Sequence, residues 1–145
     1  MKLSTRARYG LRAMLALSLC KDGAPGKTIA EMQNLPAAYL EQLMSRLRSA
    51  KLVVAIRGMR GKYVLARNPE TISLAQIVEA LEGPINIGDC ADVPNCGISP
   101  EVCILREIFK GADKALYDFF DGITLAELSA RQQEREKHVP RMYYI

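Results

Sequence analysis

Residues 28–66, TIAEMQNLPAAYLEQLMSRLRSAKLVVAIRGMRGKYVLA, decide the fold. Thr28 can cap a short helix, the Leu35-Pro36 step ends that helix, and a second helix is expected over residues 37–51. Apolar residues recur on one face of this second helix: Leu40, Leu43, Met44 and Leu47. Two short helices joined by a tight turn predict a helix-turn-helix.

The residues after the second helix predict a β-hairpin. The β-branched run LVVAI, residues 52–56, is followed by a loop with two glycines and by a second strand, YVLA, residues 63–66. A hairpin in this position is the wing of a winged helix-turn-helix. The tip of the predicted wing carries three cations, Arg57, Arg60 and Lys62.

Helices are also expected on both sides of this unit. An amphipathic helix capped by Ser4 should run to about Lys21; a secretory signal is disfavoured, because the apolar run is short and no small-residue cleavage site follows it. Ser73 and Gln76 form a capping-box pair, and Gly83 is placed to end the helix that they begin. Residues 1–83 therefore predict one winged helix-turn-helix domain. Since no other long apolar segment occurs, we expect a cytoplasmic protein that does not enter membranes.

The rest of the chain predicts a loop, two helices and a tail. Residues 84–100 form the loop, residues 101–137 a dimerisation helix and a following helix, and residues 138–145 the tail. The long helix should begin at Pro100, behind the cap Ser99, and end near Phe120. Its apolar stripe comprises Leu105, Ile108, Phe109, Ala112, Ala115, Leu116 and Phe119. A stripe of this length needs a partner helix, and a two-fold copy of the chain is the simplest one. The predicted fold class is mostly α with a small β-hairpin: a winged helix-turn-helix domain plus a long dimerisation helix.

The charge distribution points to DNA. Residues 1–67 carry thirteen Lys and Arg against three acidic residues, a net charge of +10, whereas the remainder carries −6. This asymmetry indicates that the first half meets a polyanion. The start of the second helix should read base edges, with Gln42 suited to adenine and Glu41 to cytosine, while cations further along and on the wing should reach phosphates or the minor groove. The predicted DNA-binding residues are Ala38, Tyr39, Glu41, Gln42, Ser45, Arg46, Arg48, Arg57, Arg60 and Lys62.

Three cysteines, Cys90, Cys96 and Cys103, lie in and just after the loop. Their C-x5-C-x6-C spacing lacks the short knuckle of a zinc site, and the single histidine, His138, is far away. Cys90 and Cys96 could pair reversibly in a thiol sensor. An iron-sulfur cluster suits the set better, because thiolates hold it and it tolerates irregular spacing. The fourth ligand stays open between a local carboxylate (Asp89, Asp92, Glu101 or Glu107) and a residue of a partner subunit; Arg106 cannot ligate.

The chain resembles the IscR/NsrR type of bacterial winged-helix regulators. The likeness rests on MKLSTRARYGLRAM, YLEQLMSRLRSAKLV, RGMRGKYVLAR, the three-cysteine loop and CILREIF followed by ITLAEL. The resemblance implies a homodimer that binds a two-fold operator in double-stranded DNA and carries one cluster per subunit on Cys90, Cys96 and Cys103. It also implies that residues 39–48 and 57–62 contact DNA.

Two positions depart from the family pattern. Arg106 stands where the cluster-assembly regulator has a histidine ligand, and Arg8 stands where the nitric-oxide-sensing branch takes an aspartate from the partner. Neither fourth ligand carries over. The N-terminal and recognition segments resemble the cluster-assembly regulator more closely, which favours a [2Fe-2S] over a [4Fe-4S] cluster.

The predicted function is a homodimeric, sequence-specific transcriptional regulator, expected to be a repressor, that senses redox state, iron-sulfur status or nitric oxide. The alternative is a cluster-free member of the same fold in which cysteine oxidation is the signal. An electron carrier would leave the basic half unexplained. An enzyme is not expected, because the chain offers no histidine-centred site and no phosphate-binding glycine loop.

Overall fold

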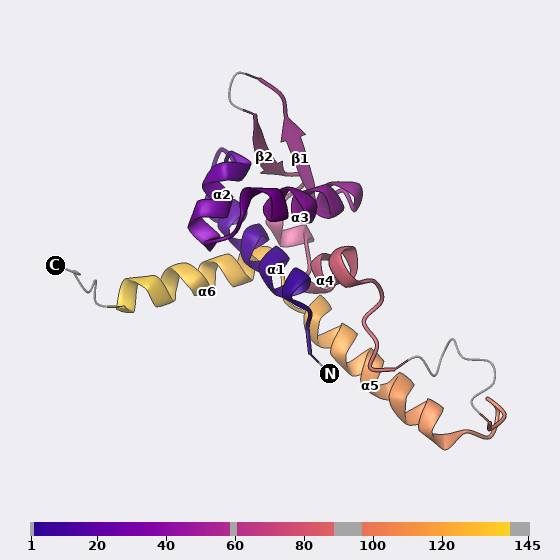
Figure 1. The fold of residues 1–145 in the computed structure, drawn as a ribbon. Coiled ribbons are helices and arrows are strands. Elements are labelled where there is room, and N and C mark those ends of the chain that lie inside the picture. Colours follow the sequence, from indigo (N-terminus) through magenta and orange to yellow (C-terminus); the bar gives the residue numbers. More distant parts are fainter. Residues whose placement is uncertain (1, 59–60, 89–96, 140–145) are drawn as a thin grey trace.

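The computed structural model describes residues 2–58, 61–88 and 97–139. Helices α1 to α4 gather in one group, the hairpin stands on this group, and α5 and α6 leave it in different directions (Figure 1). The elements are α1 (Thr5–Leu19), α2 (Gly26–Gln33), α3 (Ala37–Ser49), β1 (Val53–Ile56), β2 (Lys62–Leu65), η1 (Pro69–Thr71), α4 (Leu74–Glu82), α5 (Ile104–Asp121) and α6 (Leu125–His138). The mostly helical class with a small hairpin is confirmed. Among the described residues, no helix combines the length and apolarity needed to cross a bilayer.

The predicted apolar face of α3 is the centre of the core. Leu40, Leu43, Met44 and Leu47 are each at most 1% exposed and pack with α1 residues such as Met14. Burying one such side chain contributes about 1.5–3 kcal/mol relative to leaving it in water. The opposite face of α3 is thereby held outward at a fixed angle.

The turn between α2 and α3 follows the sequence prediction, but the start of α2 does not. Asn34 adopts the left-handed conformation, with φ of 53°, and its N–H bonds the carbonyls of Ala30 and Glu31, which ends α2. Thr28 was expected to cap α2 and instead lies inside it, because the helix already begins at Gly26 behind Pro25. The Pro25 carbonyl accepts the first helical bond from Ile29 N–H, at 3.1 Å.

The hairpin is anchored at its foot by a third extended segment. β1 and β2 are antiparallel, with Val53 opposite Leu65 and Ile56 opposite Lys62. On the other edge of β2, Ala24 and Tyr63 exchange two backbone hydrogen bonds of 3.0 and 2.8 Å. Gly23 makes this approach possible: its φ is +78°, and a Cβ there would lie 2.2 Å from the Tyr63 carbonyl oxygen.

Helix α4 begins at the predicted capping box. The Ser73 hydroxyl accepts from Gln76 N–H, and the Gln76 side chain accepts from Ser73 N–H. A short bridge pairs Ser73 with Thr124, and Leu125 N–H bonds the Ile72 carbonyl at 2.8 Å. Because Thr124 also caps α6 by accepting from Glu127 N–H, the starts of α4 and α6 are joined at one point.

Helix α5 starts later than the sequence predicted. Ser99 was expected to cap a helix from Pro100, but its carbonyl accepts from Val102 N–H and its hydroxyl donates to Glu101, which closes a turn instead. Cys103 is then extended, and the helix begins at Ile104. Its end at Asp121 agrees with the prediction. None of its described residues is buried.

Candidate nucleic-acid interface

The outer face of α3 presents the predicted base-reading residues. The opposite face of α3 packs in the core, so the predicted residues on the outer face are exposed. Along the helix these are Glu41, Gln42, Ser45, Arg46 and Arg48. Ala38, in the first turn, is exposed as well. The N-terminal turns thus offer short polar groups, while the last turn offers two guanidinium groups. This order matches base contacts at the start of a recognition helix and phosphate contacts further along.

Tyr39 combines a structural contact with its predicted place at the interface. The side chain is half-buried and packs against the core. Its ring meets the ring of Tyr9 edge to face, with centroids 6.2 Å apart, and the Arg12 guanidinium lies 5.3 Å from the Tyr9 centroid. Arg12 also bonds the Gln33 side chain at 2.9 Å and the Gln33 carbonyl at 3.3 Å. These contacts fix the start of α3 against α1 and the end of α2.

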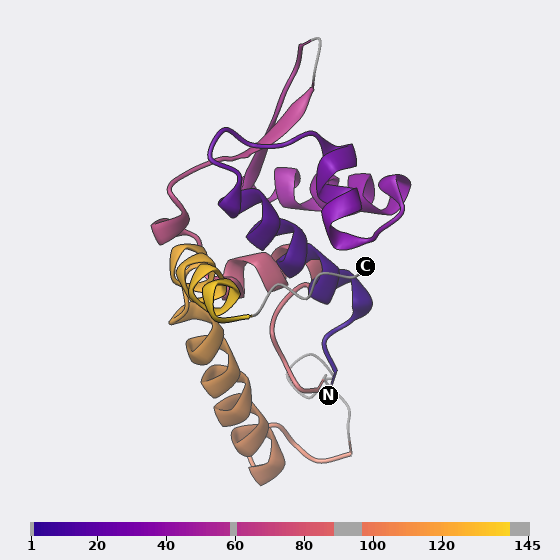
Figure 2. The same cartoon turned by 90° about the vertical axis from the view of Figure 1, so that its left-hand side faces the viewer.

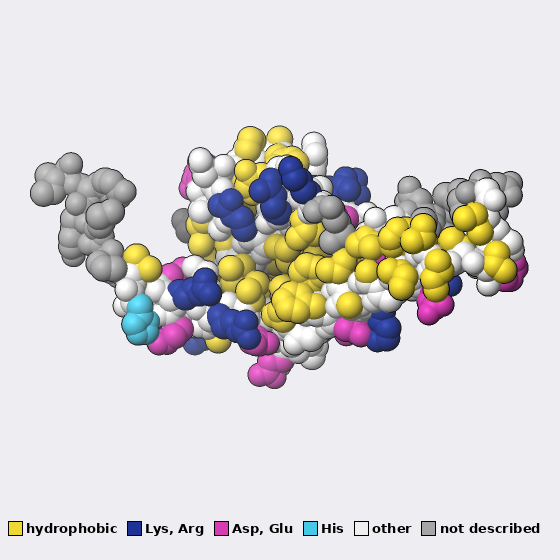
Figure 3. All heavy atoms as spheres, turned by 90° about the horizontal axis from the view of Figure 1, so that it is seen from below, with side chains coloured by type: hydrophobic (Ala, Val, Ile, Leu, Met, Phe, Trp, Pro, Cys, Tyr) yellow, Lys and Arg dark blue, Asp and Glu magenta, His cyan; other side chains and the backbone are white. Residues whose placement is uncertain are grey.

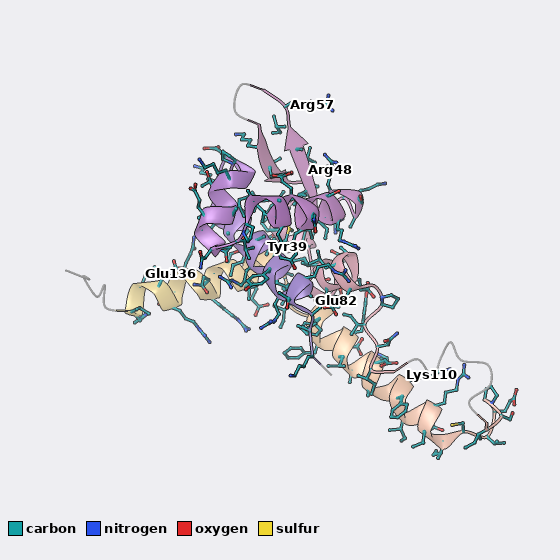
Figure 4. All side chains as sticks on the ribbon, in the orientation of Figure 1. Tyr39, Arg48, Arg57, Glu82, Lys110 and Glu136 are labelled. Carbon is teal, nitrogen blue, oxygen red and sulfur yellow. The ribbon has the colours of Figure 1, made fainter. Side chains whose placement is uncertain are left out.

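The wing places cations on the same side of the molecule as the end of α3. Figure 4 shows Arg57 on the hairpin and Arg48 close to the hairpin foot. Arg57 is exposed and Lys62 is half-buried, whereas the predicted Arg60 lies outside the described residues. Within the described part of residues 2–67, the single ion pair joins Lys27 to Glu31, at 3.9 Å. The guanidinium groups of Arg46, Arg48 and Arg57 therefore keep their charge available for phosphates.

A hollow of 370 Å³ separates the wing from the recognition helix. Its lining includes Gly26, Glu41, Arg57, Lys62 and Tyr63. The Tyr63 hydroxyl donates to Glu41 Oε2 at 2.5 Å. Burial and the Glu41 carboxylate raise the pKa of Tyr63 to about 12, so the hydroxyl stays protonated as a donor. The Glu41 carboxylate, predicted to meet cytosine, is thus engaged at the foot of the wing.

Sequence reasoning missed Tyr63, Gly26 and Arg12. Tyr63 was assigned only to a strand, and its partner is 22 positions away in the chain. Strand alternation indicates which neighbours share a face, but it does not indicate which helix a face meets. No role at this site was predicted for Gly26, the first residue of α2. Arg12 contributed only to the charge count.

The structure describes one of the three predicted cluster cysteines. Cys90 and Cys96 lie outside the described residues. Cys103 is half-buried at the N-cap of α5 and makes no capping hydrogen bond through its side chain. Within the described residues, no group of three His, Cys, Asp or Glu side chains could hold a metal ion. The predicted three-cysteine site is therefore represented here only by Cys103.

The surroundings of Cys103 are polar. A 220 Å³ hollow beside it is lined by Pro100, Glu101, Arg106, Glu107 and Lys110. The Ser99 hydroxyl lowers the pKa of the Glu101 carboxyl, which favours the ionised form. A cysteine directly before a helix suits a cluster ligand and also a reactive thiol. Arg8, the other position that departs from the family pattern, is exposed on α1.

Comparison with known proteins identifies the family. A family model described as "Rrf2: Iron-dependent Transcriptional regulator" matches residues 3–131. The chain belongs to the Rrf2 family. It is a DNA-binding transcriptional regulator with a helix-turn-helix, and the expectation that it is not an enzyme agrees with this family.

Three relatives of the Rrf2 family show how close the likeness is. The HTH-type transcriptional regulator CymR of Bacillus subtilis is 38% identical over 148 residues, which cover 100% of both chains. Its solved structure, described as the global cysteine regulator, has a TM-score of 0.74 and covers 90% of this chain and 98% of that chain. T. potens IscR is 32% identical, with a TM-score of 0.78 and coverage of 99% and 97%. The oxidised form of Staphylococcus aureus CymR is 34% identical, with a TM-score of 0.70 and coverage of 89% and 96%.

The likeness confirms the family and the fold, but it does not decide between an iron-sulfur cluster and a thiol as the sensor. Relatives named CymR and relatives named IscR match this Rrf2 chain to a similar extent, 38% and 32% identity. The expected DNA-binding regulator is confirmed at the level of the family. The cluster, its type and the operator remain proposals.

Proposed function

We propose that this Rrf2 protein is a homodimeric repressor that binds a two-fold operator and senses redox state, iron-sulfur status or nitric oxide through Cys90, Cys96 and Cys103. Residues 1–83 would be the DNA-binding domain, residues 84–100 the sensing loop and residues 101–137 the dimerisation region. The observation that carries the DNA-binding part is the shared orientation of the polar face of α3 and the cations of the wing (Figure 4).

The dimer is supported by the uncovered face of α5. Leu105, Ile108 and Phe119 are 56%, 59% and 64% exposed. Figure 3 shows a continuous hydrophobic band along this helix. A helix of 18 residues is about 27 Å long, long enough to pair with a second copy along an apolar seam. Pairing through a two-fold axis would place two α3 helices side by side for two half-sites.

The sensing loop would act through the link between α4 and α5. The segment that leaves α4 runs back toward α5 (Figure 2), where Ile87 N–H donates to Asp113 Oδ1 at 2.7 Å. At the far end of the loop, Cys103 lies directly before the first turn of α5. Loss of the cluster or oxidation of the cysteines would therefore change the orientation of α4 relative to α5. The DNA-binding unit would move with α4.

A cluster on the three thiolates would supply one-electron redox chemistry and reactivity toward nitric oxide. Cys103 would supply one thiolate from the start of α5, and Cys90 and Cys96 the other two. A [2Fe-2S] cluster is favoured over [4Fe-4S] on the resemblance of the N-terminal and recognition segments. The fourth ligand would be a local carboxylate, of which Glu101 is one candidate, or a residue of the partner subunit.

The second candidate is a cluster-free thiol sensor. It is favoured by the likeness to S. aureus CymR, whose structure is described as an oxidised form. In this case Cys90 and Cys96 would form a reversible disulfide, and Cys103 would be a third thiol at the start of the dimer helix.

Iron and acid-labile sulfide, measured with a visible spectrum on protein purified without oxygen, separate the two candidates. Stoichiometric iron and sulfide that disappear in the Cys90/Cys96/Cys103→Ala variant are expected for the cluster. Colourless, iron-free protein that still binds DNA would support the thiol sensor. In either case Cys96→Ala should uncouple DNA binding from oxidant treatment, and a variant that still responds would contradict the sensing role.

A further inference from the structure

A side-chain hydrogen bond joins the wing to the recognition helix. Among the described residues, the bond from the Tyr63 hydroxyl to Glu41 Oε2, at 2.5 Å, is the side-chain hydrogen bond between the hairpin and α3. The backbone of Tyr63 is already fixed on both edges, by Ala55 on β1 and by Ala24 in the turn before α2. The hydroxyl therefore projects from a residue that has a backbone neighbour on each edge of β2.

The pair is accommodated because α2 begins with a glycine. A Cβ on Gly26 would lie 2.4 Å from Glu41 Oε1 and 3.2 Å from Tyr63 Cε2. No positive φ is recorded for Gly26, so the backbone does not require a glycine there. The bare backbone at position 26 thus provides the space in which Glu41 and Tyr63 meet.

The cations of the wing lie beside this contact. Lys62 precedes Tyr63 on β2, Arg57 follows β1, and both line the same hollow as Glu41 and Tyr63. A two-stranded ribbon twists and bends easily when nothing braces it. A brace at its foot restricts the angle between the ribbon and α3, and this angle sets how far the cations lie from the base-reading residues.

We propose that Tyr63 is a positioning residue of the DNA interface: its hydrogen bond to Glu41, in the space left by Gly26, holds the wing at the angle from which Arg57 and Lys62 reach phosphates while α3 lies in the major groove. The inference rests on the proposed use of α3 and the wing. Tyr63 acts through the wing and does not itself need to contact DNA. The bond also keeps the Glu41 carboxylate at the wing foot, which leaves Gln42 and Ser45 as the first polar groups for bases.

The test measures the salt dependence of binding to a defined probe. The probe is a duplex enriched by the wild-type protein from a random 30-base-pair pool, and affinity is measured by fluorescence anisotropy over a range of KCl concentrations. Tyr63→Phe removes the hydroxyl, and Gly26→Ala keeps both partners but displaces the Glu41 carboxylate. Each should weaken binding by about 3- to 10-fold at low salt, the loss expected for one hydrogen bond. Each should also flatten the salt slope, because wing phosphate contacts are lost.

A double variant shows whether the two substitutions act through the same bond. Tyr63→Phe combined with Gly26→Ala should bind about as well as either single variant, since the bond can be lost only once. Arg131→Gln on α6 is the control and should leave the affinity and the slope unchanged, because its guanidinium pairs with Glu127 outside the DNA-binding unit.

The outcomes separate this inference from the proposed function. A wild-type slope in Tyr63→Phe, at any affinity, would overturn the positioning role while the interface of α3 and the wing stands. Additive losses in the double variant would overturn the shared bond. If Arg57→Gln and Lys62→Gln also leave the wild-type slope unchanged, the wing does not contact phosphates, and both the inference and this part of the proposed function fail.

Discussion

Helices α3 and α5 are both amphipathic, yet the apolar face of α3 is buried and the apolar face of α5 is exposed. The apolar face of α3 is at most 1% exposed at Leu43 and Leu47, whereas Leu105 and Ile108 of α5 are more than half exposed. The chain covers the first face with its own α1 and α4 and leaves the second face bare. The difference indicates that the described helices of the DNA-binding unit cover one another, and it supports the proposal that α5 packs against a second copy of the chain.

A matched pair of substitutions separates the two helices most strongly. Leu43→Ala removes a fully buried side chain and should lower the free energy of unfolding by about 2–5 kcal/mol at every protein concentration. Leu105→Ala should act through association, so its cost in urea unfolding should change with protein concentration. Equal losses, independent of concentration, would show that α5 is not an interface helix.

Two glycines of the DNA-binding unit, Gly23 at the wing foot and Gly83 at the end of α4, differ in how closely they are packed. Gly23 and Gly83 both have positive φ, but a Cβ on Gly23 would lie 2.2 Å from the Tyr63 carbonyl oxygen, whereas a Cβ on Gly83 would meet nothing within 4 Å. Gly83→Ala should lose about 1–3 kcal/mol from backbone strain alone, and Gly23→Ala should lose more. Thermal unfolding of the two variants measures the difference. A smaller shift for Gly23→Ala would contradict the close packing at the wing foot.

The cations of the packed unit should matter for DNA, and those of the distal helix should not. Arg46→Gln or Arg57→Gln is expected to weaken operator binding and to reduce the salt slope by about one per subunit. Arg131 on α6, paired with Glu127, is the control, and Arg131→Gln should leave the slope unchanged. Unchanged binding in the Arg57 variant would remove the wing from the interface.

The smallest expected effect is a pH dependence at the wing foot. The pKa of Tyr63 is raised to about 12, so folding favours the neutral phenol. Its contribution to stability is therefore fully present below pH 10 and is lost as the pH rises toward 12. Wild-type protein should lose more stability over this interval than Tyr63→Phe. Phenolate absorbance should show a late-titrating tyrosine that is missing in Tyr63→Phe.

Local patterns in the sequence predicted the packed unit well. The spacing of Leu40, Leu43, Met44 and Leu47, the capping box at Ser73 and the two strands each depend on neighbours in the chain, and each is confirmed. The start of α5 was predicted four residues early. Ser99 and Pro100 carry a helix-start signal, but Ser99 uses its carbonyl and hydroxyl to close a turn on Val102 and Glu101.

The contacts that sequence reasoning could not supply join distant residues. Three features of the wing foot depend on the angle at which the hairpin packs on the helices. They are the bond between Tyr63 and Glu41, the space left by Gly26 and the backbone pairing of Ala24 with Tyr63. Neither residue type nor spacing encodes that angle. The cysteines show the opposite case: the motif is evident in the sequence, and the structure describes only Cys103 of the three.

The molecular mass in solution tests the central claim most directly, because the operator-binding account requires two copies joined through α5. Sedimentation equilibrium should give wild-type protein twice the 16.1 kDa of one chain. The Leu105→Asp/Ile108→Asp variant should sediment as a single chain, keep its helical circular dichroism and lose tight binding to a two-fold operator. A wild-type protein of 16.1 kDa, or a variant that remains a dimer, would contradict the account.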